Sequence, residues 1–323
     1  MFDVRPVFNV IGLLVSCLGL TMMFPMALDM SRGNGHAGVF LESALITCLT
    51  GSMMYLATRR EAARGLTLQQ TFLLTSGVWL ALPIFGALPF ALGATDSSFT
   101  DAFFEAMSGL TTTGATVISG LDYLPDGLLL WRSILQWLGG IGIIVVAMVF
   151  LPELRVGGMQ IFKSEGFDTF GKILPRATEI AAQVAWLYVG LTGACAVIYI
   201  ATGMRSFDAV LHAMTTIATG GFSTYDSSFV KFGASTEYAA VVFMCLAALP
   251  FVRYVQLING APGSLFHDSQ VRVFFIVLLV TVGFLTLVLW QGYQFSGELG
   301  FRKALFNVVS ITTGTGYASA DYS

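Results

Sequence analysis

Runs of about 20 apolar residues recur along the chain, and they constrain its fold more than any other feature of the sequence. A helix of about 20 residues crosses a hydrocarbon core of about 30 Å, whereas membrane-spanning strands are about ten residues long and alternate in hydrophobicity. Only 11% of the residues are charged and the mean hydropathy is +0.77, where a soluble domain carries about 25% charged residues. The sequence therefore predicts an all-α polytopic membrane protein and excludes an ordinary soluble enzyme.

The apolar runs predict seven spans, at 8–28, 38–57, 70–92, 128–151, 180–203, 236–257 and 271–293. The first is longer than a signal-peptide core and no small-residue cleavage site follows it, so we expect it to be retained. With a cytoplasmic N-terminus, ten of the sixteen basic residues lie inside, as the positive-inside rule requires. The ten are Arg5, Arg59, Arg60, Arg64, Arg155, Lys163, Lys172, Arg176, Arg253 and Arg272. Most acidic residues then lie outside, where they either attract cations or simply solvate the loops.

Three of the outer connections share one sequence pattern. The segments are DAFFEAMSGLTTTGATV at 101–117, DAVLHAMTTIATGGFST at 208–224 and KALFNVVSITTGTGYAS at 303–319. They align without gaps, with Gly114, Gly221 and Gly316 at one position, so the repeat periods are 107 and 95 residues. Each unit combines an apolar span, a short amphipathic segment and a Thr/Gly run, followed in the first two by a second span. This is internal repetition of a span, half-helix, loop, span module.

The short segment before each Thr/Gly run can enter a membrane but not cross it. In the first copy, Ser98 to Leu110 forms a helix of about 20 Å, well short of the bilayer. Asp96, Ser97 and Ser98 supply N-cap chemistry at its outer end, so the helix should run inward and direct its C-terminal carbonyls, which favour a cation, towards the bilayer centre. The TTTG run at 111–114 then returns outward as non-helical backbone, which must be buried in protein or line a wet cavity.

Threonine and glycine suit such a loop for separate reasons. Glycine permits positive φ and close approach of neighbouring backbone, so that successive carbonyls can face one ion. Threonine adds a hydroxyl oxygen, and a ring of neutral oxygens is how potassium pores replace the hydration shell of the ion. A single run would equally suit a re-entrant loop or a helix cap without special function, but three aligned copies favour ion coordination.

One aligned position in the short helices is polar in all three copies: Glu105, His212 and Asn307. Because their chemistry differs between copies, we interpret them as hydrogen-bonding to the neighbouring loop or to water, with a proton relay or a metal site as the alternative. The sequence contains no nucleophile with a base, no metal-ligand cluster and no phosphate loop, so an enzyme is not expected. A net charge of −3 offers no basic surface for nucleic acid.

Taken together, these motifs resemble the TrkH/KtrB family of potassium uptake subunits, most closely its bacterial TrkH branch, over essentially the whole chain. TTTGAT at 111–116, ATGGFS at 218–223 and TTGTGYAS at 312–319 are similar to the first three selectivity-filter loops of that family. QWLGGIGIIV at 136–145 is similar to the start of its first inner helix. SEGFDTFGKILPRATEIA at 164–181 is similar to its cytoplasmic connection into the second repeat.

The resemblance implies a pseudo-fourfold, channel-like pore built by one chain, with two extra N-terminal helices packed outside it. The implied parts are an N-terminal two-helix extension (1–66), a first pore repeat (67–152), a cytoplasmic connection (153–178), a second pore repeat (179–258) and an incomplete third repeat (259–323). The filter glycines would be Gly114, Gly221 and Gly316. The potassium-coordinating carbonyls would belong to Thr112, Thr113, Thr219, Gly220, Gly314 and Thr315.

The resemblance also implies potassium uptake down its gradient across the bacterial inner membrane, by a homodimer with cytoplasmic N-termini. Potassium is then the substrate and the only metal ion implied, and rubidium should pass nearly as well. No covalent cofactor is implied, and a nucleotide would act only through a cytoplasmic TrkA-like nucleotide-binding ring subunit that gates the pore. Basic residues of the inner loops are either docking points for that ring or topology signals: Lys163, Lys172, Arg176, Arg253 and Arg272.

Two alternatives remain open at this point. One is a secondary transporter that couples potassium to protons or sodium by symport, and the other is a non-conducting regulatory or assembly fragment. The second arises because the family has four repeats, whereas this sequence stops at Ser323, just after its third filter-like loop. We therefore expect a truncated copy that does not conduct alone.

Overall fold

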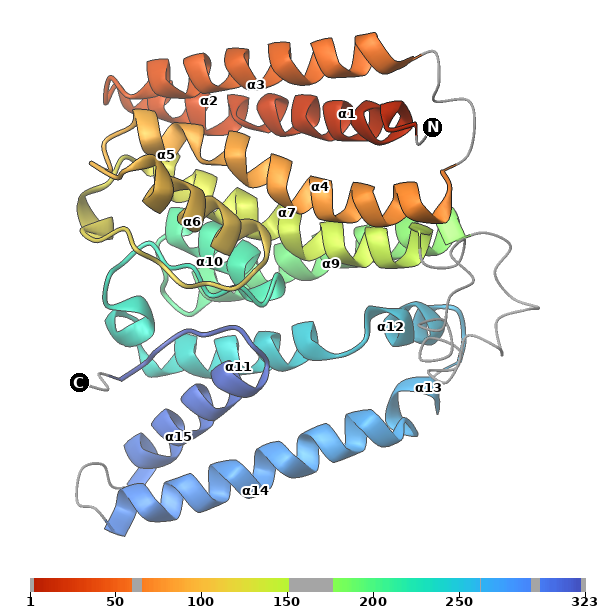
Figure 1. Cartoon of the computed structure of the whole chain (residues 1–323). Helices are drawn as coiled ribbons and strands as arrows, with labels where there is room; N and C mark the ends of the chain where they lie inside the picture. The colour runs from red at the N-terminus through yellow and green to blue at the C-terminus, as the bar shows by residue number, and fades with distance from the viewer. Residues whose placement is uncertain (1–2, 60–65, 151–176, 262, 292–296, 321–323) are drawn as a thin grey trace. The chain divides into compact units, whose positions relative to one another are not determined.

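The computed structural model describes residues 3–59, 66–150, 177–261, 263–291 and 297–320 (Figure 1). Over these residues the regular elements are helices, as predicted, and no strand is present. The chain divides into two compact units. The first comprises Met1–Thr111 and Ala115–Gln136, and the second comprises Thr112–Gly114 and Trp137–Ser323.

The first unit opens with a helical hairpin in which α1 and α2 lie beside α3 (Figure 1). A Cβ on Gly12 would lie 2.7 Å from the Tyr55 nitrogen, and one on Gly51 would lie 2.6 Å from the Ser16 nitrogen, so glycine lets the two helix backbones meet. α4 packs against both α1 and α6. The elements of this unit are α1 (Arg5–Thr21), α2 (Met23–Arg32), α3 (Ala37–Thr58), α4 (Leu68–Gly86), α5 (Leu88–Leu92), α6 (Phe99–Leu110), η2 (Leu121–Tyr123) and the first part of α7 (Asp126–Phe150).

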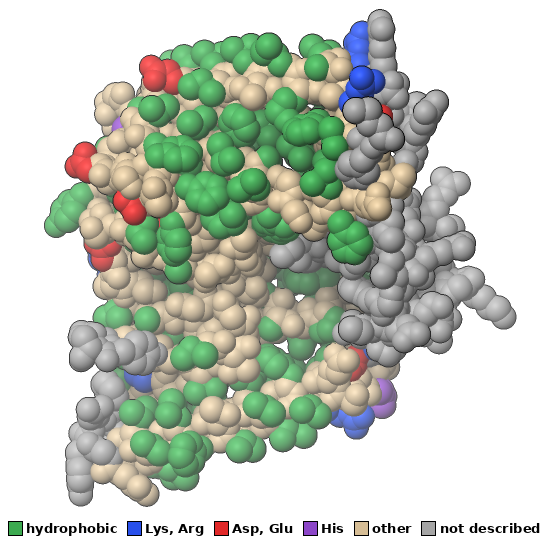
Figure 2. All heavy atoms as spheres, viewed as in Figure 1, with side chains coloured by type: hydrophobic (Ala, Val, Ile, Leu, Met, Phe, Trp, Pro, Cys, Tyr) green, Lys and Arg blue, Asp and Glu red, His purple; other side chains and the backbone are tan. Residues whose placement is uncertain are grey.

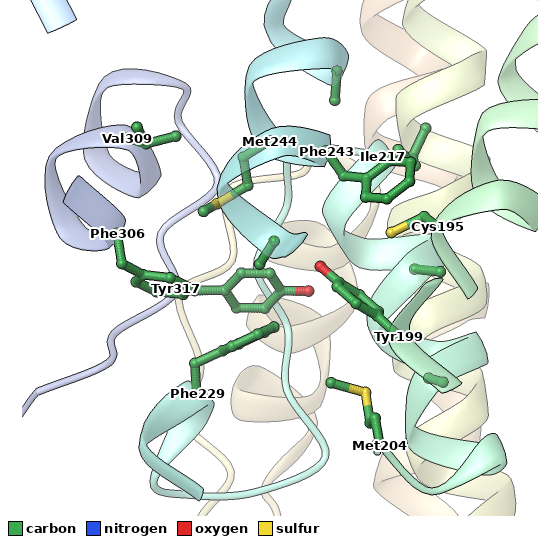
Figure 3. Packing of buried hydrophobic residues seen from close by; sticks show 14 of the residues in the cluster. Cys195, Tyr199, Met204, Ile217, Phe229, Phe243, Met244, Phe306, Val309 and Tyr317 are labelled. Atoms are coloured by element: carbon green, nitrogen blue, oxygen red, sulfur yellow. The ribbon is translucent and has the colours of Figure 1, made fainter. Parts of the chain in front are cut away.

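The second unit contains two further half-helices, α10 and α15. α10 packs against α9 and α11, and α15 packs against α11 and α14. Aromatic side chains fill the core between them, with Tyr199, Phe229, Phe306 and Tyr317 at its centre (Figure 3). The elements of this unit after α7 are α9 (Ala177–Ala201), α10 (Ser206–Ile217), η5 (Ser228–Lys231), α11 (Ala234–Ala248), α12 (Phe251–Ile258), α13 (Gly263–Phe266), α14 (Ser269–Gln291) and α15 (Gly297–Thr312).

Among the described residues, five helices are long and apolar enough to cross a membrane, and they confirm five of the seven predicted spans. α7, at the place of a sixth, is a helix of 25 residues. In Figure 2 hydrophobic side chains cover the visible faces of α3 and α14, while charged side chains gather near the helix ends, as contact with lipid requires. The five spans are Arg5–Arg32, Ala37–Thr58, Gln69–Leu92, Ile180–Ala201 and Ser269–Gln291.

At the predicted span 236–257 two helices together are long and apolar enough to cross a membrane, but they do not form one continuous helix. α11 ends at Ala248, α12 begins at Phe251, and the two helices meet at an angle of 87°. Pro250 explains the break, because proline has no N–H to donate and disfavours helical backbone in the residue before it. Leu249 accordingly adopts extended backbone, with ψ 148°. A count of apolar residues does not register this interruption, because leucine, proline and phenylalanine all suit a membrane.

Candidate ion-coordination loops

Each Thr/Gly run follows a short helix, as predicted. α6 and α10 have 12 residues each and α15 has 16, so at about 1.5 Å per residue none reaches across a core of about 30 Å. The predicted N-cap of α6 is confirmed, because the Ser98 side chain accepts a hydrogen bond from the Asp101 N–H at 3.2 Å. Each loop therefore begins at the end of a helix that is too short to span a membrane.

The three loops share one backbone conformation at their aligned positions. The first left-handed residue of each is Thr112 (φ 55°), Thr219 (φ 53°) or Gly314 (φ 79°), and the second is Gly114 (φ 77°), Gly221 (φ 73°) or Gly316 (φ 83°). The residue between them has negative φ in every loop. Left-handed backbone costs a threonine about 1–3 kcal/mol. The surrounding structure must therefore hold both Thr112 and Thr219 in this conformation. This agreement confirms that the runs are structural repeats with periods of 107 and 95 residues.

Alternation between right-handed and left-handed backbone determines the direction in which successive carbonyl oxygens point. In a regular strand successive residues face opposite sides, whereas alternating hands let successive carbonyl oxygens turn to the same side. Residues 112–114 group with the second unit although the residues on either side belong to the first. All nine residues predicted to form the filter therefore belong to one compact unit.

In the first repeat a buried carboxylate holds the backbone that leaves the loop. Glu105 accepts hydrogen bonds from the Thr116 hydroxyl at 2.9 Å and from the Val117 N–H at 3.1 Å. Its charge is balanced by Arg132, whose Nε donates to Glu105 at 2.8 Å and whose Nη2 donates to Thr116 at 3.2 Å. Both charged side chains are at most 1% exposed. Burying them is tolerable only because they are paired and hydrogen-bonded.

The second repeat makes the equivalent connection with an imidazole. His212 Nδ1 lies 2.8 Å from the carbonyl oxygen of Asp208, which can only accept, so Nδ1 carries the proton. Nε2 then accepts from the Ser223 hydroxyl, 3.0 Å away. The Ser223 oxygen in turn accepts from the Tyr225 N–H at 3.1 Å. The imidazole thus ties the half-helix to the backbone that follows the loop.

The third repeat makes the connection with an amide. Asn307 accepts from the Ser319 N–H at 3.1 Å and donates to the Ser319 hydroxyl at 3.1 Å. The hydrogen-bonding interpretation of Glu105, His212 and Asn307 is therefore confirmed. Within the described part of the chain, no group of three or more His, Cys, Asp and Glu residues could hold a metal ion.

The second and third loops meet backbone to backbone. A Cβ on Gly221 would overlap the carbonyl oxygen of Thr315, so no residue larger than glycine fits there. The segments beyond the two loops are also joined, since the Phe229 N–H donates to the Ala318 carbonyl at 2.9 Å. Close approach at Gly221 was the reason for expecting glycine in these runs, and at this position the expectation is confirmed.

A cavity of about 220 Å³ lies beside the first and second loops, within the second unit. Thr112 and Thr219, the left-handed threonines, contribute to its wall. Gly140 of α7 lets the Tyr188 side chain approach the α7 backbone closely, because a Cβ there would lie 2.5 Å from the Tyr188 hydroxyl oxygen. The remaining lining residues are Gly139, Ile217, Ala218, Ala247 and Phe251. Phe251 is the first residue of α12, so the broken helix supplies part of the lining.

The basic residues predicted as docking points are only partly described. Lys163, Lys172 and Arg176 lie outside the described residues. Arg253 pairs with Asp268 at 2.8 Å, with 20% of its side chain exposed, so much of its charge is already compensated. Arg272 is exposed, and its Nη2 donates to the carbonyl of His267 at 3.3 Å.

Sequence reasoning missed Arg132, the partner of Glu105. A signal was present, because a lone arginine inside the apolar run at 128–151 needs a partner wherever that run enters a membrane. Sequence reasoning also missed the side-chain bond of Tyr317, which reaches residues about 100 positions away. Nothing in the local pattern around Gly316 predicts that contact.

The chain is similar in sequence to known proteins over almost its whole length. The family model described as "TrkH: Cation transport protein" matches residues 36–323. Trk system potassium uptake protein TrkI of Halomonas elongata is 38% identical over 321 residues, covering 98% of this chain and 65% of that protein. Trk system potassium uptake protein TrkH of Escherichia coli strain K12 is 37% identical over 321 residues, covering 98% of this chain and 66% of that protein.

A solved structure is similar over the same extent. The crystal structure of the potassium transporter TrkH from Vibrio parahaemolyticus matches with a TM-score of 0.88 at 33% identity, covering 99% of this chain and 66% of that one. The chain therefore spans about two thirds of the length of these relatives.

Proposed function

Because the chain belongs to the TrkH family of cation transport proteins, we propose that it contributes to the uptake of potassium ions through a pathway lined in part by the backbone carbonyls of its three loops. The observation that carries the proposal is the shared left-handed backbone at aligned positions of all three loops. The relatives' names, which are those of potassium uptake proteins and a potassium transporter, support the choice of ion.

The proposed coordination uses neutral oxygen only. The oxygens are the carbonyls that precede Gly114, Gly221 and Gly316, and such carbonyls replace the hydration shell of a potassium ion. α6, α10 and α15 each end at a loop, so the partial negative charge of each C-terminus favours a cation there. The cavity beside Thr112 and Thr219 offers room for an ion that still carries water.

The proposed selectivity is looser than that of a TVGYG ring, because only one glycine position, that of Gly114, Gly221 and Gly316, is shared by all three loops. Rubidium should pass nearly as well as potassium. A sodium permeability close to that of potassium would count against the assignment.

The proposal extends to topology and partners. The chain would lie in the bacterial inner membrane as part of a homodimer with cytoplasmic N-termini, which the distribution of basic residues supports. A cytoplasmic nucleotide-binding ring subunit would gate the pathway, and exposed Arg272 is the best described candidate for contact with it. The division into an N-terminal extension and successive pore repeats, with boundaries near 66, 152, 178 and 258, belongs to the same proposal.

Uptake of radioactive rubidium by cells carrying the chain's own gene, compared with cells lacking the gene, tests the proposal. We expect gene-dependent uptake that excess potassium suppresses and equal sodium does not. Gly114→Ser should reduce the preference for rubidium over sodium, because serine at φ 77° is strained and displaces the neighbouring carbonyls. Gly190→Ser in α9 is the matched control, since a Cβ there meets no atom within 4 Å. Equal rubidium uptake by cells with and without the gene would contradict the proposal.

A further inference from the structure

We propose that the hydroxyl of Tyr317 is a positioning group that fixes the spacing between the second and third loops and thereby contributes to ion selectivity. This inference rests on the proposed function. Tyr317 follows Gly316 directly and is 2% exposed. Its ring enters the aromatic core of the second unit, where it packs on Phe229 with ring centroids 4.5 Å apart (Figure 3).

The hydroxyl reaches a half-helix of a different repeat. It lies 2.5 Å from the Thr215 hydroxyl and 3.2 Å from that of Thr216, and it donates to the carbonyl of His212 at 3.1 Å. These three residues belong to the last turns of α10, the helix that leads into the second loop. One phenol oxygen therefore joins the third loop to the base of the second.

The backbone of Tyr317 is held from the other side. Its carbonyl accepts from the Ser310 hydroxyl at 2.7 Å, and Ser310 lies on α15, the half-helix of its own repeat. The residue is thus fixed to α15 by its backbone and to α10 by its side chain. Since the ring between these two bonds is rigid, it acts as a spacer of constant length between the two half-helices.

Only the third loop has this connection. The aligned residues in the first and second repeats are Ala115 and Phe222, neither of which carries a hydroxyl. The backbone bond is nevertheless repeated in the first copy, where the Ser108 hydroxyl donates to the Ala115 carbonyl at 2.6 Å. The backbone bond therefore belongs to the repeat, whereas the link between repeats is an addition made by Tyr317.

The Tyr317 link lies next to the point where the second and third loops meet, so it affects the spacing of the carbonyls proposed to bind the ion. The second and third loops meet at Gly221 and the carbonyl of Thr315 with no room to spare. Thr315 lies two residues from Tyr317, so loss of the hydroxyl would free the third loop to move away from the second. A wider or more variable spacing of carbonyls discriminates less between ions of different size.

Tyr317→Phe tests the inference, because it removes the hydroxyl and keeps the ring. Tyr199→Phe is the matched control: its hydroxyl lies 2.9 Å from that of Thr216 in the same core, but the residue belongs to α9 and not to a loop (Figure 3). Both variants should show similar thermal stability. In the rubidium uptake assay, Tyr317→Phe should lower the preference for rubidium over sodium by about fivefold, which corresponds to one net hydrogen bond. Tyr199→Phe should leave the preference unchanged.

The outcomes separate the two claims. A selective wild type with an unchanged Tyr317→Phe variant would overturn this inference and leave the proposed function standing. An equal loss of preference in both variants would also overturn it, because the effect would then belong to the core as a whole. A wild type without gene-dependent rubidium uptake would remove the proposed function and this inference with it.

Discussion

Thr112 and Thr219 adopt a backbone conformation that is unfavourable for a β-branched residue, and they do so at the same step of two repeats. The aligned residue in the third repeat is Gly314, which adopts the conformation without strain. The three repeats therefore share left-handed backbone at this position, although the residue type differs between them. The hydrogen bonds that hold the first two loops on their half-helices offset this backbone strain.

At the residue scale, Gly221 gives the sharpest prediction. Gly221→Ala should abolish selective rubidium uptake and lower the free energy of unfolding by about 1–3 kcal/mol, because φ is 73° and the new Cβ would overlap the Thr315 carbonyl. Uptake assays and thermal unfolding of the purified protein measure the two effects. Gly233→Ala is the control, since a Cβ at that position meets nothing within 4 Å. Equal behaviour of the two variants would contradict the described contact between the loops.

At the scale of elements, each half-helix is joined to the backbone after its loop by a buried polar side chain, and the chemistry differs in each. The half-helices, their loops and the N-cap at Ser98 could be predicted from sequence, because apolar length, cap residues and an ungapped repeat are local signals. The break before Phe251 and the Glu105–Arg132 pair were not predicted. The break has a local cause in Pro250, which a count of apolar residues does not register. The partner of Arg132 depends on which segments meet after folding, which a window of sequence does not contain.

Removing one partner of the Glu105–Arg132 pair should lower the free energy of unfolding strongly, and replacing the other partner as well should recover much of the loss. Arg132→Met should cost about 3–5 kcal/mol, because it leaves Glu105 buried without a countercharge. Adding Glu105→Gln should recover much of that loss, since glutamine keeps an acceptor for the Val117 N–H. Arg32→Met is the control: its partner is Asp126 and its side chain is 52% exposed, so the change should cost less than about 1 kcal/mol. Denaturant unfolding in detergent compares the three, and an equal cost for both single variants would refute the argument.

Asp208 predicts a dependence of stability on pH. Burial alone would raise the pKa of this carboxyl, but hydrogen bonds from Arg205 and Tyr225, with the Arg205 charge and Thr224, keep the pKa below its ordinary value. A lowered folded-state pKa stabilises the fold above the unfolded-state pKa of about 3.9, and this stabilisation is lost as pH falls through the folded-state value. Melting temperatures between neutral pH and about pH 3 should therefore fall more steeply for the wild type than for Asp208→Asn. Parallel curves would contradict this assignment.

At the scale of the whole molecule, the chain is a multi-pass membrane protein of the TrkH family with three copies of one half-helix and loop. The repeat could be predicted from sequence because its glycines align without gaps. The membership of residues 112–114 in the second unit could not, since it depends on which distant segments fold around them, such as the residues Gly140 and Thr219 that share a cavity wall with Thr112. All the proposed coordinating residues share that unit, which supports the central claim alongside the left-handed backbone that the three loops have in common.

The most direct test of that claim is to locate the ion. Crystals of the protein grown with rubidium in place of potassium, measured at the rubidium absorption edge, reveal bound ions as anomalous peaks. We expect peaks beside the carbonyls of Thr113, Gly220 and Thr315, with loss of these peaks in Gly221→Ala. Ordered loops without any peak, or peaks only at sites remote from all three loops, would contradict the central claim.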